Sequence, residues 1–358
     1  MKTHSPLSII LTTLLVVAFG WGVAFLVTRG IEAMRPSVIT VETTTDQKAL
    51  TLSANIVNPA VPAQVKSTHE LTVLVGGDIM FDRGIRALGD KNGYDSLFDN
   101  NLVTLFKRAD IVAANLEGPI TSYPSKTLVG GKIVTDNLTF TFPPRVRTTL
   151  KDSGITIVSQ ANNHADNFGY LGTMETQDWL EDAGVAWFGN PWNSTSTKMS
   201  RINSIGQTPL ATIMSKNGIR VAFVGYHAFQ PGFERVLSEI RRVATPDTFV
   251  IVVPHWGEEY IATSSDRMKS QARAFMTAGA DAIIGAHPHV IMDQEWVDGV
   301  PVFYSVGNLL FDQYFSPHVM TGNVIELHIV QDDTGIHLAN TTTHTIQLVK
   351  GMGTKLVE

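Results

Sequence analysis

The chain has 358 residues, 44% of them hydrophobic and 17% charged, which is typical of a globular α/β or α+β protein and excludes a largely disordered one. The formal net charge is −6 and there is no long basic block, so a nucleic-acid partner is not expected. Because the sequence contains no cysteine, disulfides and thiol nucleophiles are excluded, and any metal site must use His, Asp, Glu or Asn.

An uncharged apolar run occupies residues 7–27. As a helix it would be about 31 Å long, close to the hydrocarbon thickness of a bilayer. No small-residue cleavage site follows it, so we expect residues 1–28 to be a short tail and a transmembrane signal anchor rather than a cleaved signal peptide or a buried core helix. Lys2 flanks the run on one side and Arg29 and Arg35 on the other, so charge alone does not fix the orientation.

The next segment, residues 29–69, reads as an extended stalk, because from residue 37 it is rich in Thr, Val, Ser, Ala and Pro and has little helical periodicity. The folded domain is expected over residues 70–350. Strands are predicted at 71–75, 111–114, 155–158, 185–188, 249–253, 282–284, 300–305 and 324–330, and helices at 97–108, 146–152, 172–183 and 268–278. Strands at 210–214 and 219–224 flank Lys216-Asn217-Gly218, a hairpin signal. This order predicts a layered α/β domain with more antiparallel strand near the C-terminus.

Polar residues follow five of the predicted strands, at the end where sites form in α/β sheets. Each is ordinary by itself, because Asp caps helices, Asn forms turns and a lone His is often structural. Only the H-x-H pair in "GAHPHV" is suggestive alone. The residues are Asp78 after the first strand, Asn115 and Glu117 after the second, Asn162, Asn163, His164 and Asp166 after the third, His255 after the strand at 249, and His287 and His289 after the strand at 282.

Taken together, these carboxylates, amides and imidazoles form a mixed oxygen and nitrogen donor set. Such a set suits Mn, Fe or Zn and is too rich in nitrogen for a dedicated Ca²⁺ site. Six or more ligands exceed what one tetrahedral ion needs, whereas two divalent ions sharing a carboxylate would use them all. Paired ions of this kind activate water and hold both oxygens of an in-line phosphoryl displacement.

Six short motifs now point to a family: "GGDIMFDR", "NLEGPIT", "QANNHADNFG", "PHWGEEY", "GADAIIGAHPHVI" and "YSVGNLLFD". In this order they resemble the CapA/PgsA-type proteins of bacterial poly-γ-glutamate capsule biosynthesis, within the calcineurin-like metallophosphoesterase superfamily. The resemblance implies a four-layer α/β/β/α sandwich with metal ions at the strand ends. It also implies a domain outside the cytoplasm, held in the cell membrane by the single N-terminal transmembrane helix.

Carried over residue by residue, the resemblance assigns the metal ligands and two catalytic residues. His164 is expected to face the phosphoryl oxygen or the leaving group, and Asp166 to orient His164. Glu117 stands where the superfamily usually places a bridging Asp. The ligands are Asp78, Glu117, Asn163, His255, His287 and His289.

The sequence also departs from the superfamily pattern. Met80 replaces the His of the usual Asp-x-His motif, and Leu116-Glu117 replaces Gly-Asp. One metal site is therefore expected to be weaker or differently built. Two roles stay open for three further polar residues, Asp82, Asn308 and Asp312: they could position the substrate or form turns. A structural role is favoured for Asp312.

Three functions remain open from the sequence. The favoured one is a membrane-anchored, metal-dependent hydrolase that acts on an anionic polymer or phosphoester in capsule or envelope metabolism. The second is a non-catalytic scaffold or polymer-binding subunit that works with other subunits of a capsule synthase or export complex. The third is an anchored α/β domain whose histidines are structural.

Overall fold

The computed structural model describes residues 69–134, 136–194 and 210–357. The predicted anchor, residues 1–28, lies outside the described residues, as does the predicted stalk except for His69. Within the described ranges, no helix is both long enough and apolar enough to cross a bilayer.

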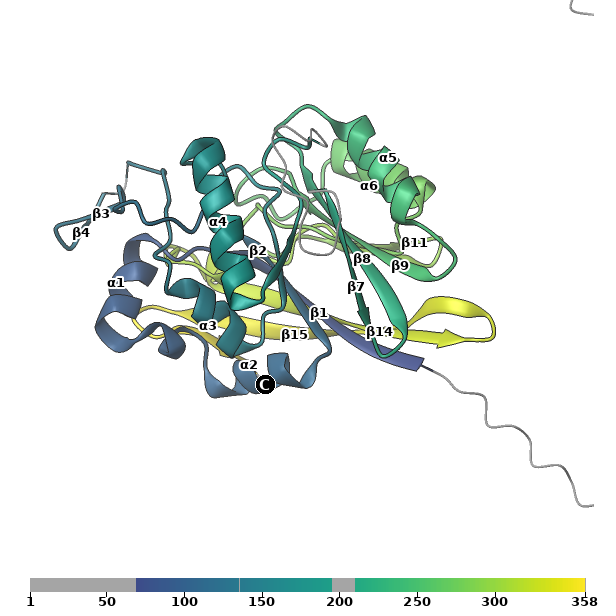
Figure 1. The fold of residues 1–358 in the computed structure, drawn as a ribbon, viewed down its shortest axis with the longest axis horizontal. Helices are drawn as coiled ribbons and strands as arrows, with labels where there is room; N and C mark the ends of the chain where they lie inside the picture. The colour runs from purple at the N-terminus through teal and green to yellow at the C-terminus, as the bar shows by residue number, and fades with distance from the viewer. Residues whose placement is uncertain (1–68, 135, 195–209, 358) are drawn as a thin grey trace, which may run out of the picture. The chain divides into compact units, whose positions relative to one another are not determined.

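The first sheet has eight strands in the order β16-β15-β14-β1-β2-β5-β6, with β13 paired beside β1 (Figure 1). Its parallel part contains β1 (His69–Ile79), β2 (Ile111–Leu116), β5 (Ile157–Ser159), β6 (Ala186–Phe188) and β13 (Asn308–Leu310). Its antiparallel part contains β14 (Thr321–Asp332), β15 (Gly335–Val349) and β16 (Gly353–Leu356). The antiparallel strands come last in the chain, as predicted.

The second sheet has six strands in the order β11-β12-β10-β9-β8-β7. The predicted hairpin is confirmed, because β7 and β8 pair antiparallel around a turn in which Asn217 and Gly218 have φ of 53° and 83°. The strands are β7 (Ala211–Lys216), β8 (Ile219–His227), β9 (Thr248–His255), β10 (Ala282–Ile284), β11 (Gln294–Val297) and β12 (Val300–Phe303), and a separate short pair is formed by β3 (Leu128–Val129) and β4 (Lys132–Ile133).

Helices cover the outer face of each sheet, and a third apolar cluster lies between the sheets. Between the sheets, Val73 and Ile325 of the first belong to the same buried cluster as Phe223 and Ile251 of the second. The mixed α/β fold is therefore confirmed, with its layers in the order helices, sheet, sheet, helices. On the first sheet lie α1 (Arg83–Asn92), the 3₁₀ turn η1 (Tyr94–Leu97), α2 (Asn100–Arg108), α3 (Val146–Ser153) and α4 (Gly169–Ala183); on the second lie α5 (Phe233–Val243) and α6 (Asp266–Ala278); α7 (Pro317–Met320) precedes β14.

Several elements differ from the prediction. The helix predicted from residue 97 begins at Asn100, because the Asp99 side chain caps it by accepting a hydrogen bond from the Leu102 N–H at 2.8 Å. Helices α1 and α5 were not predicted. The strand pairing of the first sheet runs on to Leu356, past the predicted domain end at residue 350.

Candidate metal centre

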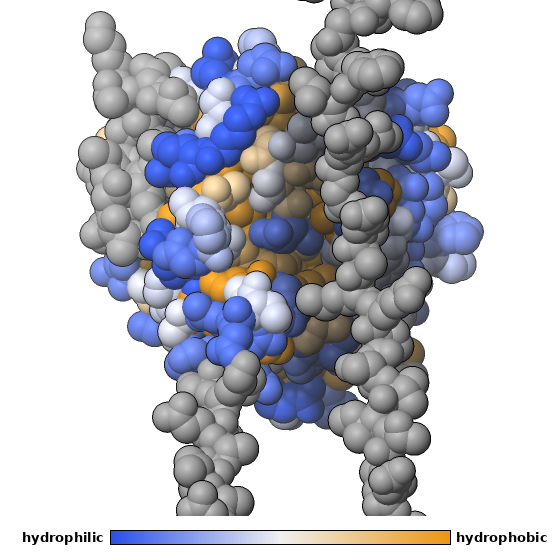
Figure 2. All heavy atoms as spheres, turned by 90° about the vertical axis from the view of Figure 1, so that its right-hand side faces the viewer, coloured by the Kyte–Doolittle hydropathy of each residue, from blue (hydrophilic) through white to orange (hydrophobic). Residues whose placement is uncertain are grey.

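The carboxyl ends of parallel strands bring the predicted site residues together. Asp78 lies at the end of β1 and pairs in register with Asn115 of β2 and Asn308 of β13. In the second sheet, His255 ends β9. The other predicted residues are on the loops that follow these ends: Glu117 after β2, Asn163, His164 and Asp166 after β5, and His287 and His289 after β10. Figure 2 views the opposite end of the domain, where β1 begins, and hydrophobic atoms are visible there between hydrophilic ones.

Five of the six predicted ligands form two groups that share one carboxylate. Glu117, His255 and His287 make one group, and Asp78, Glu117 and His289 make the other, with the ligand atoms of each group within 4.8 Å of one another. Oε1 of Glu117 lies 3.7 Å from Nε2 of His255 and 3.8 Å from Nε2 of His289. Glu117 therefore occupies the position of a bridge between two cation sites.

The sixth predicted ligand, Asn163, points at the same place. Its Oδ1 lies 2.7 Å from Nε2 of His255, and Nδ1 of His287 lies 3.1 Å from that same nitrogen. Ligand atoms of Asn163 and His287 therefore both lie close to Nε2 of His255, and a cation bound there could contact all three.

The carboxylate of Glu117 shows that the residues fit a cation. Glu117 is fully buried, and neither of its oxygens has a hydrogen-bond partner within the part of the chain that the structure describes. A buried acceptor without a partner costs about 1–3 kcal/mol, and more when it is charged. A divalent ion bound to Glu117 would remove this cost.

Burial and mutual charge set the protonation of the ligands. Burial, helped by the charge of Asp78, raises the pKa of Glu117 well above its ordinary value. Burial lowers the pKa of His255 well below its ordinary value and that of His287 to about 4, so both imidazoles are neutral and ready to ligate. Burial would also lower the pKa of His289, but the charges of Glu117 and Asp78 outweigh it and raise that pKa to about 9.

Three asparagines position the ligands, although sequence reasoning gave none of them this role. Nδ2 of Asn115 donates to Oδ1 of Asp78 at 2.7 Å, and Asn162 donates to Oδ1 of Asn115 at 3.1 Å. Oδ1 of Asn308 lies 2.9 Å from Nδ1 of His289. Such contacts fix the orientation of ligand side chains. The only signal in the sequence was their location at strand ends.

The predicted contact between Asp166 and His164 is wrong, because Asn167 makes it instead. Nδ1 of His164 lies 3.2 Å from Oδ1 of Asn167, which also accepts the Phe140 N–H at 2.7 Å. The turn after β5 brings Asn167 within hydrogen-bond distance of this ring nitrogen. The charge of Asp166 acts on another histidine, His227. Burial lowers the pKa of His164 to about 4.

His227 is a further histidine near the centre that sequence reasoning missed. It ends β8 opposite His255 of β9, and the two ring centroids are 6.1 Å apart. Its Nδ1 lies 2.9 Å from the carbonyl oxygen of Pro191, while its buried Nε2 has no hydrogen-bond partner among the residues that the structure describes. Its location at a strand end in "VGYH" was the available signal.

The backbone around the centre is strained. Four residues other than glycine have positive φ there: Arg83 at 47°, Tyr260 at 66°, His287 at 101° and His289 at 58°. Such values cost roughly 1–3 kcal/mol each and concentrate at functional sites. In the loop that carries both histidines, a side chain at Gly285 would overlap the carbonyl oxygen of Tyr304, so glycine is required.

Asp82 and Asp312 each accept hydrogen bonds that hold neighbouring segments in place. Asp82 accepts hydrogen bonds from the Arg86 and Ser125 side chains and from the Thr141 N–H. Asp312 binds Arg83 and the Gly84 N–H, which agrees with the structural role favoured for it.

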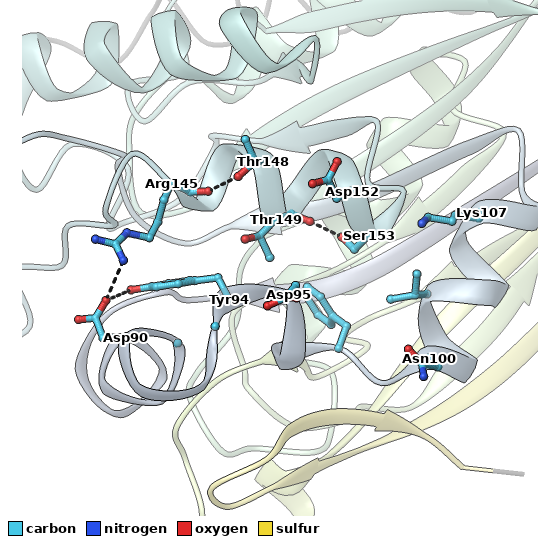
Figure 3. A pocket seen from close by; sticks show the side chains of 14 residues that line it. Asp90, Tyr94, Asp95, Asn100, Lys107, Arg145, Thr148, Thr149, Asp152 and Ser153 are labelled. Carbon is cyan, nitrogen blue, oxygen red and sulfur yellow. Dashed lines mark hydrogen bonds and ion pairs between the residues drawn. The ribbon is translucent and has the colours of Figure 1, made fainter.

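A hollow lies away from these residues, between α1, η1, α2 and α3 (Figure 3). Its volume is about 630 Å³, and Asp90 in its wall binds Tyr94 at 3.0 Å and Arg145 at 3.6 Å. Its acidic and basic side chains are mixed, and none of the predicted ligands lines it. The candidate centre is therefore the cluster at the strand ends.

Comparison with known proteins finds a family model and two curated relatives that are all described as capsule synthesis proteins or as CapA. Residues 72–313 match the family model described as bacterial capsule synthesis protein. The chain is 30% identical over 273 residues to the PGA biosynthesis protein CapA of Bacillus subtilis, covering 72% of this chain and 68% of that protein. It is 28% identical over 294 residues to the capsule biosynthesis protein CapA of Bacillus anthracis, covering 77% and 68% respectively.

Solved structures are more distant. A calcineurin-like phosphoesterase of Bacillus subtilis is 15% identical with a TM-score of 0.46, covering 78% of this chain and 91% of that one. A phosphatase from Mycoplasma pneumoniae is 13% identical with a TM-score of 0.47, covering 78% and 95%. Scores below 0.5 do not establish a shared fold, so the fold rests on the sheets and helices described above.

Proposed function

The chain belongs to the bacterial capsule synthesis protein family, and from this premise we propose that it is a membrane-anchored, metal-dependent hydrolase of capsule or related envelope polymer metabolism. We further propose that its two-sheet sandwich is of the metallophosphoesterase type. The observation that carries the proposal is the buried carboxylate of Glu117, which has no hydrogen-bond partner in residues 69–134, 136–194 and 210–357 and is shared by two ligand groups.

The proposed cofactor is a pair of divalent ions. His255, His287 and Asn163 would hold one ion, Asp78 and His289 the other, and Glu117 would bridge them. The mixed oxygen and nitrogen donors favour Mn, Fe or Zn. Bound ions would supply activated water near neutral pH and would polarise a phosphoryl or carbonyl oxygen.

His164 is the proposed proton-transfer residue. With a pKa of about 4 its ring is neutral at pH 7 and donates from Nδ1 to Asn167, so Nε2 is left as a proton acceptor. An anionic substrate bound beside the ring would raise this pKa and allow Nε2 to pass a proton to the leaving group.

The hydrolase proposal is tested with a generic aryl phosphate diester and added Mn²⁺. Metal-dependent turnover should be lost in His289→Ala and Asn163→Ala. His344→Ala is a matched control, because this histidine pairs with Glu326 on β14, apart from the ligand groups. A fully metal-loaded protein that turns over neither phosphate esters nor γ-glutamyl polymer would overturn the hydrolase proposal.

Location and partners are part of the same proposal. The apolar run in residues 1–28 supports a single-pass anchor in the cytoplasmic membrane, with residues 29–69 as a stalk and the domain outside the cytoplasm. The substrate would be an anionic polymer or phosphoester, and nucleic acid is not expected. Protease added to intact protoplasts should remove the domain; full protection would contradict this orientation.

One observation favours a non-catalytic alternative, in which the metal fold serves as a scaffold or polymer-binding subunit of a synthase or export complex. Met80 stands where a ligating His is usual, and it is fully buried with its sulfur 2.9 Å from the Asp82 nitrogen. It therefore supplies no replacement nitrogen ligand. Rescue of polymer production in a deletion strain by the His287→Ala/His289→Ala double variant would favour this scaffold, whereas failure to rescue would favour hydrolysis.

A further inference from the structure

The guanidinium of Arg83 is held against two aromatic rings at the edge of the candidate centre. Its carbon Cζ lies 5.1 Å from the ring centroid of Phe140 and 5.5 Å from that of Phe311. These rings contact site histidines in turn, because Phe140 lies 4.4 Å from His164 and Phe311 lies 4.8 Å from His289, centroid to centroid. Arg83 is thus placed between the proposed proton-transfer residue and a proposed ligand.

The backbone holds Arg83 there at a cost. Its φ of 47° is left-handed, which arginine seldom adopts. Asp312 fixes this geometry through both of its oxygens, since Oδ1 accepts from Nη2 of Arg83 at 2.5 Å and Oδ2 accepts from the Gly84 N–H at 3.0 Å. A strained residue that its neighbours clamp in place is typical of a functional position.

One donor of Arg83 is unsatisfied. Its Nε is buried and has no hydrogen-bond partner among the described residues, while 14% of the side chain remains accessible to solvent. Arginine only donates hydrogen bonds and keeps its charge in proteins, so this donor calls for an acceptor, which a bound oxyanion would supply. Guanidinium groups match pairs of carboxylate or phosphate oxygens.

We propose that Arg83 is an oxyanion-binding residue that anchors a carboxylate or phosphate group of the substrate beside the metal centre. This inference rests on the proposed function in one respect, namely that a substrate reaches the cluster at the strand ends. Asp312 acts as the positioning residue that aims the guanidinium. The oxyanion has two possible sources, a phosphoester or the free carboxylates of an acidic polymer, and the two titrations below distinguish them.

The test measures binding and does not depend on turnover. Inorganic phosphate and glutarate are titrated separately into the purified full chain by calorimetry, with and without Mn²⁺. The variants are Arg83→Gln, Arg83→Lys and Asp312→Asn. Arg145→Gln is the matched control, because Arg145 also lies over an aromatic ring, Tyr94 at 5.5 Å, and also pairs with an aspartate, Asp90.

We expect Arg83→Gln to weaken binding of the preferred anion by about tenfold or more, the loss expected for a charge-assisted hydrogen bond. Asp312→Asn should weaken it less, and Arg83→Lys should restore only part of it because lysine lacks the planar fork. A loss confined to phosphate assigns a phosphoester, and a loss confined to glutarate assigns a polymer carboxylate.

Equal affinity of the wild-type chain and Arg83→Gln for both anions, or an equal loss in Arg145→Gln, overturns the inference. Should Arg83→Gln unfold, as a thermal melt would reveal, the Asp312→Asn titration decides in its place, and unchanged affinity there overturns the inference. Anion binding that depends on Arg83 in a protein without turnover would sustain this inference and refute the hydrolase. Turnover in a protein whose anion binding does not depend on Arg83 would support the hydrolase and refute this inference.

Discussion

Oε1 of Glu117 lies 3.8 Å from Nε2 of His289, and no described residue donates a hydrogen bond to either oxygen of that carboxylate. Because Glu117 is common to both ligand groups, Glu117→Ala should abolish binding of both ions. Elemental analysis after Mn²⁺ loading and dialysis checks this. Glu326→Ala is the control, since Glu326 also binds two histidines but lies outside the centre. Wild-type metal content in Glu117→Ala would refute the shared carboxylate.

The two ligand groups should be separable. Asp78 belongs to only one group and His255 only to the other, so Asp78→Asn and His255→Ala should each remove one ion and leave one. Metal-to-protein ratios measured on both variants would show this as a fall from two to one in each. If either variant lost both ions while remaining folded by thermal melt, the two sites would be coupled and the division into two groups would be wrong.

Metal binding should strengthen as the pH rises. The pKa of His289 is raised to about 9 in the metal-free protein, so at pH 7 this imidazole is protonated and must lose its proton to ligate. Apparent Mn²⁺ affinity should therefore increase toward pH 9, by up to about tenfold per pH unit for each proton released. Calorimetry in two buffers with different protonation enthalpies measures the released protons. Affinity that stays flat over this range would contradict the assignment of His289.

The glycine before Asp78 should be irreplaceable. A Cβ at Gly77 would overlap the carbonyl oxygen of Gly307, a backbone atom that cannot move aside cheaply. Gly77→Ala should lower the free energy of unfolding by about 3 kcal/mol or more and reduce metal content, because β1 and Asp78 shift together. Gly130→Ala is the control. Its φ is 56°, but a Cβ added there would meet no atom within 4 Å beyond its chain neighbours, so this change should cost only about 1–2 kcal/mol. Denaturant titration of both variants makes the comparison.

Sequence reasoning was most accurate where a strand is buried on both faces. The runs at 111–114, 249–253 and 282–284 are continuous apolar stretches, and each became a strand followed by a site residue. Because parallel strands align their carboxyl ends, the location of the metal cluster could be predicted from the sequence. Asp78, Glu117, Asn163, His255, His287 and His289 do lie together, although their roles as ligands stay a prediction.

The remaining contacts depend on geometry that spacing does not encode. Asn167 rather than Asp166 contacts His164, because a one-residue step in the turn after β5 decides which side chain reaches Nδ1 of the ring. The contact between Asn308 and His289 joins the first residue of β13 in the first sheet to the loop after β10 of the second, and no local pattern predicts it. Helix α1 was missed because its sequence, RGIRALGDKN, contains two glycines and few apolar residues.

The two-ion centre is tested most directly by a crystal structure of the protein with metals assigned by anomalous scattering. Two metal peaks are expected on either side of the Glu117 carboxylate, one near His255 and His287 and the other near Asp78 and His289. Absence of any peak in crystals grown with Mn²⁺, Fe²⁺ or Zn²⁺ would contradict it and would leave the histidines with a structural role.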